Sequence, residues 1–120
     1  MAIKDTCCSI HPYFTVKEGK LQEFKAVCER MVAATSEEPG CLYYGFTFDG
    51  IEASCREGYA DGDALLAHAQ HVGPLLGEAM QYADLTRMEV QGPEEELSKV
   101  RGPMADLSPR FYSLEVGFRR

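Results

Sequence analysis

Chemistry in this 120-residue chain can be sought first in its three histidines, His11, His68 and His71. A histidine inside a pocket can act as a general base, because imidazole exchanges its proton near neutral pH. His68 lies between Leu65 and Val72 on the apolar stripe of an expected helix, so its ring is predicted to face the interior. There it could take a proton from a phenolic substrate. The alternative is a hydrogen-bonded histidine of the core.

The other two histidines are expected at the margins of such a pocket. His71 follows His68 by three residues, about 60° around the same helix, and is a candidate substrate contact. This spacing could supply two metal ligands, but the local sequence fixes no carboxylate or thiol beside them, so no metal site is predicted. His11 projects from the first expected strand with Ser9 and Tyr13. It is a second acid–base candidate if that face lines the pocket, and otherwise it packs at a subunit contact.

Aromatic side chains and one arginine complete the set of candidates. Tyr44, Phe46 and Phe48 share one face of an expected strand and could wall a pocket for a flat apolar ligand, or could simply fill the core. Arg56 alternates with Ser54 on the neighbouring strand. It could stabilise a developing enolate or oxyanion, and the alternative is a salt bridge with a helix carboxylate.

The five cysteines are predicted to be reduced thiols that pack as small buried hydrophobes. Their number is odd and their spacing contains no CxxC motif, which favours a reducing compartment. Redox chemistry at Cys41 or Cys55 is the alternative. No GxGxxG, phosphate-loop, GxSxG or HExxH motif is present, so the usual sequence signs of nucleotide, serine-hydrolase and zinc chemistry are missing.

Hydrophobic periodicity positions these residues on alternating strands and helices. Pro12 requires an edge position or a bulge in the first strand, and Gly73-Pro74 is expected to break the second helix. Asp49-Gly50 is a strong hairpin signal. The expected order is strand 6–16, helix 20–35, strands 41–48 and 52–59, a helix from Asp61 that resumes over 75–82, strand 84–91, helix 94–100 and strand 110–118.

The first six elements give the β-α-β-β-α-β order of ferredoxin-like folds, an α+β class. One domain is expected, with a core over residues 8–91 and an extension over residues 92–120. Apolar residues on both faces of strands 41–48 and 110–118 suggest that a second copy covers the open face of the sheet, giving a homodimer. Coverage by the extension alone is the other possibility.

Composition excludes several classes of partner. The formal net charge of −7 argues against nucleic acid and against an anionic membrane surface. No run approaches the roughly 20 apolar residues of a membrane helix, and Lys4 and Asp5 interrupt any signal peptide, so the chain is expected in the cytoplasm. A neutral small molecule and another copy of the chain remain as partners.

Four segments resemble those of one known family. EPGCLYYG (38–45) is similar to the start of the second strand in antibiotic biosynthesis monooxygenase (ABM) proteins. REGYAD (56–61) and ALLAH (64–68) resemble their third strand and second helix, and FTVKEGK (14–20) resembles their first strand and turn. The resemblance covers roughly residues 8 to 91 and leaves the extension unexplained.

This resemblance implies a homodimer of ferredoxin-like subunits, each with a pocket between sheet and helices. Some members oxygenate aromatic polyketides without metal or flavin, and others degrade haem or cleave or isomerise small molecules. The chain has no tryptophan, and Ser9 and His11 stand where haem-degrading members use an asparagine, which argues against haem degradation.

The sequence therefore suggests a monooxygenase-like protein that needs no cofactor and acts on a small aromatic or quinol. His68 would accept the proton, and Arg56 or Tyr44 would stabilise the anion. A non-catalytic dimer that binds a small ligand is the alternative.

Overall fold

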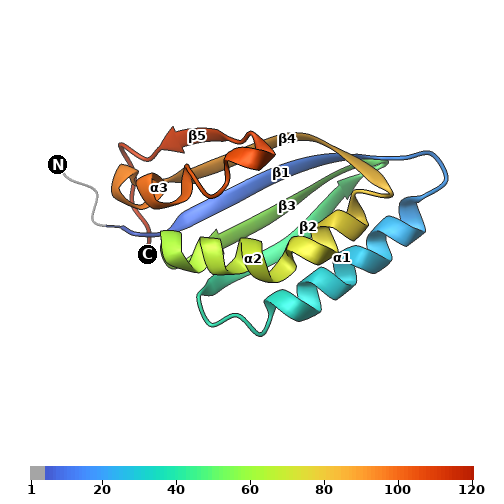
Figure 1. The fold of residues 1–120 in the computed structure, drawn as a ribbon, viewed down its shortest axis with the longest axis horizontal. Coiled ribbons are helices and arrows are strands. Elements are labelled where there is room, and N and C mark those ends of the chain that lie inside the picture. Colours follow the sequence, from blue (N-terminus) through green and yellow to red (C-terminus); the bar gives the residue numbers. More distant parts are fainter. Residues whose placement is uncertain (1–4) are drawn as a thin grey trace.

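The computed structural model describes residues 5–120, which form a five-stranded mixed sheet with its helices packed against one face (Figure 1). The elements in chain order are β1 (Cys8–Val16), α1 (Leu21–Thr35), β2 (Cys41–Asp49), β3 (Glu52–Tyr59), α2 (Gly62–Ala79), β4 (Ala83–Gly92), α3 (Glu94–Val100), the 3₁₀ turn η1 (Ala105–Leu107) and β5 (Arg110–Ser113).

The predicted β-α-β-β-α-β arrangement is confirmed. Within residues 5–120 the strand order is β2-β3-β1-β4-β5, in which all neighbours are antiparallel except the parallel pair β4–β5. The first and last core strands, β1 and β4, lie side by side in the middle of the sheet. Alternate residues of each strand therefore point either at the helices, here called the inner face, or away from them, the outer face.

Two packed clusters fill the space between the inner face and the helices. One joins Phe14 of β1 to Phe24 and Met31 of α1. The other joins Ile10 of β1 to Leu65 of α2 and also contains residues of α3 and η1. The helix stripes predicted from the sequence supply these contacts, since 3.6-residue periodicity keeps such residues on one side of each helix.

Both prolines that were expected to disturb an element are accommodated. Pro12 is not at an edge: β1 is central, and its pairing with β4 shifts register between Tyr13 and Phe14, the bulge that was the other prediction. The break at Pro74 is wrong, because α2 continues to Ala79. Pro74 and Gln70, whose carbonyl loses its helical donor, are both exposed, so water can satisfy that carbonyl.

Strand β2 differs in register from the simple alternation. A shift between Cys41 and Tyr43 places Cys41 opposite Tyr59, on the inner face with Tyr44, whereas alternation had put the two on opposite faces. The hairpin turn is also one residue later than predicted. Asp49 pairs with Glu52, and Gly50 takes the positive φ of 61° that the turn requires.

The C-terminal extension (92–120) lengthens the helical layer over β4 and β5 (Figure 1). The predicted helix 94–100 is confirmed, but the last strand ends at Ser113 and not at residue 118. Its partner β4 stops at Gly92, opposite Ser113, so the chain after Leu114 has run past the strand that it pairs with. No helix within residues 5–120 is long and apolar enough to cross a membrane.

Candidate active site

Strand β3 carries a buried carboxylate on the inner face of the sheet. Cys55, Glu57 and Tyr59 alternate along it and are all buried, with Glu57 only 4% exposed. The Tyr59 hydroxyl donates a hydrogen bond to Glu57 Oε1 at 2.6 Å. A carboxyl group in this position is costly to ionise, because burial removes the water that would solvate its charge.

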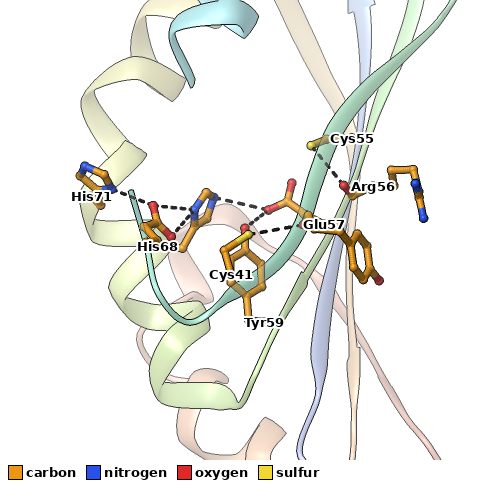
Figure 2. A network of polar contacts seen from close by, with 9 residues as sticks. Cys41, Cys55, Arg56, Glu57, Tyr59, His68 and His71 are labelled. Carbon is orange, nitrogen blue, oxygen red and sulfur yellow. Dashed lines mark hydrogen bonds and ion pairs between the residues drawn. The ribbon is translucent and has the colours of Figure 1, made fainter. Parts of the chain in front are cut away.

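Helix α2 brings His68 against this carboxylate (Figure 2). His68 is 3% exposed, as its place on the apolar stripe predicted, and its Nε2 lies 3.4 Å from Glu57 Oε1. Its ring packs against two tyrosines, with centroids 4.8 Å from Tyr59 and 5.2 Å from Tyr44. These two contacts hold the imidazole in position.

A second carboxylate, Glu38, holds the other nitrogen of this ring. Its Oε1 and Oε2 lie 3.0 and 3.1 Å from His68 Nδ1. Because an ionised carboxylate can only accept, Nδ1 carries the hydrogen, and Nε2 is left as the acceptor that faces Glu57. His71 Nδ1, 2.7 Å from Glu38 Oε2, donates to the same carboxylate from the protein surface.

The loop that carries Glu38 can pack closely against α2 because residue 40 is a glycine. A Cβ atom at residue 40 would lie 2.6 Å from Ala64 Cβ. The connection between β3 and α2 is bonded to the same loop, because Ala60 N donates to Gly40 O at 2.9 Å. Ala64 is one helical turn before His68, so this close contact places Glu38 at the level of the imidazole.

A small cavity of about 60 Å³ opens beside Glu57 and His68 on the inner face. Its walls are otherwise almost entirely apolar and come from all parts of the chain, including Phe14 of β1, Phe46 of β2 and Met104 from the extension. A few polar groups in an apolar hollow are typical of small-molecule sites.

Burial changes the proton affinities of this pair in opposite directions. Burial raises the pKa of Glu57 to about 7, although the hydrogen bonds from Tyr59 and Cys55 oppose the shift. Burial also lowers the pKa of His68, against the nearby charge of Glu38, which favours the imidazolium. Near neutral pH Glu57 can therefore be either protonated or ionised, beside an imidazole whose burial favours its neutral form, as acid–base catalysis requires.

The neighbouring thiols and phenols stay protonated. Burial raises the pKa of Cys41 to about 11 and holds that of Cys55 well above its ordinary range. Burial likewise raises the pKa values of Tyr44 and Tyr59. A thiolate is therefore disfavoured at both cysteines, which argues against the thiol-based alternative.

The predicted binding residues are partly brought together. Tyr44 and Phe46 line the cavity. Phe48 shares their strand face but lies farther along it, 37% exposed and in edge contact with Phe24. His71 is exposed and reaches the site only through Glu38.

The structure does not bring Arg56 and His11 to this cavity. Both project from the outer face; Arg56 points away from Glu57 and covers the Tyr43 ring at 5.1 Å (Figure 2). His11 Nε2 is 2.8 Å from Ser9 Oγ on that same face. Adjacent residues of a strand face opposite ways, so Arg56 and Glu57 cannot both reach the cavity.

Sequence reasoning missed Glu57, Tyr59 and Glu38. Alternation along β3 could have revealed Glu57. Ala53, Cys55 and Tyr59 are hydrophobic residues on one face of the strand, and a glutamate at residue 57 of that same face is unusual. Glu38 was noticed as part of a family motif, but its contact with His68 spans 30 residues and no local signal reveals it.

Comparisons with known proteins agree with this architecture. A sequence model described as antibiotic biosynthesis monooxygenase matches residues 9–74, and no curated protein sequence matches the chain. MupZ from Pseudomonas fluorescens is 46% identical and superposes with a TM-score of 0.92, over 97% of this chain and 96% of that protein.

More distant structures share the fold. A conserved protein from Methanosarcina mazei Go1 is 22% identical, with a TM-score of 0.64 over 71% of this chain and 88% of its own. SnoaB, a cofactor-independent oxygenase from Streptomyces nogalater, is 18% identical, with a TM-score of 0.63 over 71% of this chain and 90% of its own. By the family match and the likeness to MupZ, the chain belongs to the antibiotic biosynthesis monooxygenase family.

Proposed function

We propose that the protein is a monooxygenase-like enzyme that needs no cofactor and oxidises a small, neutral phenol or quinol in the cavity beside Glu57. The observation that carries this proposal is the pair Glu57–His68, whose Oε1 and Nε2 atoms lie 3.4 Å apart at the wall of an otherwise apolar cavity. The oxygenase activity of the structural relative SnoaB gives independent support.

The reaction begins with removal of the substrate's phenolic proton. Glu57 in its ionised form, or His68 through Nε2, accepts this proton, and the Tyr44 hydroxyl is the candidate donor to the resulting anion. A ring carbon of the phenolate then reduces O₂ to a carbon-bound peroxide, which takes a proton back from Glu57 or His68 and becomes a hydroperoxide. Loss of water leaves one oxygen on the substrate as a carbonyl, while the C–H and O–H hydrogens leave with the other oxygen.

The proton has a route to solvent through three further contacts. Glu57 lies 3.4 Å from His68, His68 lies 3.0 Å from Glu38, and His71 lies 2.7 Å from Glu38. Side-chain exposure rises along this route from 5% at Glu57 to 13% at Glu38 and 45% at His71. Successive acceptors and donors of this kind can exchange the proton with solvent between its removal from the substrate and its return to the peroxide.

The proposal is tested by oxygen consumption with a panel of quinols, naphthols and polyphenols, together with the variant Glu57→Gln. The glutamine keeps the shape of the side chain but cannot take a proton, so activity should fall by about 10²- to 10⁴-fold. Glu52→Gln, the same substitution at the exposed start of β3, should leave activity unchanged.

Two results would overturn the proposal. One is the absence of oxygen consumption across the panel when ligand binding at the cavity is detected, which would favour the non-catalytic binding protein. The other is oxygen consumption that Glu57→Gln and His68→Gln both leave at the wild-type rate, which would place the chemistry elsewhere.

A further inference from the structure

The C-terminal extension (92–120), which the resemblance to the family did not explain, supplies one wall of the cavity. Met104 and Leu107 both line it, and Met104 is 4% exposed. We propose that this wall sets the size of the ligand and makes Met104 and Leu107 specificity-determining residues. This inference rests on the proposed function because it assumes that the ligand binds in the cavity beside Glu57. It does not depend on which reaction the ligand undergoes.

The extension is packed against the core and hydrogen-bonded to it. Leu97 and Val100 of α3 are fully buried in the same cluster as Ile10 of β1. The Glu96 carboxylate accepts a hydrogen bond from Gly62 N at 2.9 Å, which ties α3 to the first turn of α2. A Cβ atom at residue 62 would lie 2.8 Å from Glu96 O, so this approach depends on glycine.

A second set of hydrogen bonds joins α3 to β5 within the extension. Arg101 and Ser113 both donate hydrogen bonds to Glu94 Oε2, at 2.8 and 2.9 Å, which joins α3 to β5. The segment between Arg101 and β5 is therefore held at both ends. Met104 and Leu107 lie within it, and the turn closes at Ser108 with a positive φ of 51°.

The sheet fixes the direction in which a ligand would lie. Glu57 is on β3, while Met88, which also lines the cavity, is on β4. The central strand β1 separates them, so two strand spacings of roughly 5 Å each, about 10 Å in all, lie between the acidic end and the apolar end. A ligand with one hydroxyl at Glu57 and a flat apolar body would extend towards Met104.

Because the cavity is small, the side chains that line it determine which ligands fit. About 60 Å³ is less than the roughly 150 Å³ of an apolar cavity that accepts benzene, so a ring requires side chains to move. Met31, Met88 and Met104 are unbranched and can change rotamer at little cost. Leu107, which also lines the cavity, is branched and stiffer, so in this proposal it limits how far a second ring can extend.

Methyl NMR with ¹³C-labelled methionine tests contact directly, with phenol and 1-naphthol as probes. Both probes should shift the methyl signal of Met31, and 1-naphthol should also shift those of Met88 and Met104. Met80, which is exposed at the C-cap of α2, should not respond. Shifts at Met31 and Met88 without any at Met104 would overturn the inference and leave the proposed function standing. No shift at any of the three would overturn both.

Two substitutions then test size selection. Leu107→Ala should raise the affinity for 1-naphthol relative to phenol by roughly tenfold, and Leu107→Trp should lower it by a similar factor. Leu42→Ala, at an exposed leucine of β2, is the matched control and should leave the ratio unchanged. An unchanged ratio in both Leu107 variants would overturn the role of this wall.

Discussion

At the scale of single residues, Glu57 links the site to folding. Its pKa rises from 4.5 to about 7 because the folded chain buries it. Between these values the folded state binds more protons than the unfolded state, so stability falls as pH rises through this window. Above about pH 7 Glu57 is ionised in both states, and the full free-energy cost of burying its charge lowers the stability of the fold. Ionised Glu57, the form that the proposed reaction uses as a base, therefore destabilises the fold.

Glu57→Gln should consequently remove a pH dependence. The variant is expected to be more stable than the wild type, and its advantage should grow by about 2 kcal/mol between pH 5.5 and pH 8. Urea unfolding at several pH values measures this difference. Glu52→Gln should follow the wild-type curve, since Glu52 is exposed. Parallel curves for Glu57→Gln and wild type would contradict the raised pKa.

His71 allows the proton route to be tested apart from substrate binding. Its ring contacts Glu38 but does not line the cavity. His71→Gln should therefore lower kcat and leave KM unchanged, and added imidazole buffer should restore part of the lost rate. A change confined to KM would instead support the earlier prediction that His71 contacts substrate.

At the scale of elements, the contact between the α1–β2 loop and α2 decides where Glu38 lies. Gly40→Ala would force its Cβ to within 2.6 Å of Ala64 Cβ. Overpacking of this kind costs typically 1–3 kcal/mol. The loop should move outward, so the variant should lose stability and loosen the bond between Glu38 and His68.

A double-mutant cycle separates this steric effect from glycine's flexibility. Ala64→Gly in the Gly40→Ala background should return much of the lost stability and restore the His68 Nδ1–H signal in NMR. Gly77→Ala in α2, where a Cβ meets nothing within 4 Å, should stabilise the helix by up to about 1 kcal/mol. Additive effects of the Gly40 and Ala64 substitutions would contradict the packing argument.

The elements themselves were predictable, but the site only in part. Alternation and helical stripes are local, so they predicted β1, α1, the β2–β3 hairpin and the inward face of His68. The same alternation along β3 would have favoured Glu57 over Arg56. Local patterns could not predict contacts between segments that are distant in the sequence. Glu38 reaches His68 because Gly40 allows its loop to approach α2, and Met104 reaches the cavity because the Gly62–Glu96 hydrogen bond holds α3 against α2.

At the scale of the whole molecule, the outer face of the sheet remains partly apolar. A hollow of about 480 Å³ on this face is lined by Tyr43, Tyr112 and residues of the C-terminal segment, among them Leu114, Val116 and Phe118. Val116 and Phe118 are 88% and 82% exposed. Clustered apolar side chains of this kind are typical of surfaces that bind another protein.

We expect a second copy of the chain to cover this hollow, as the sequence suggested. Light scattering at about 10 μM should then give twice the monomer mass of 13.3 kDa. Val116→Ser and Phe118→Ser should shift the mass towards the monomer, because each removes apolar surface from the contact. Ile51→Ser at the hairpin turn, 50% exposed and away from the hollow, is the matched control. A monomeric wild type, or equal dissociation by Ile51→Ser, would show that this face does not form a specific dimer contact.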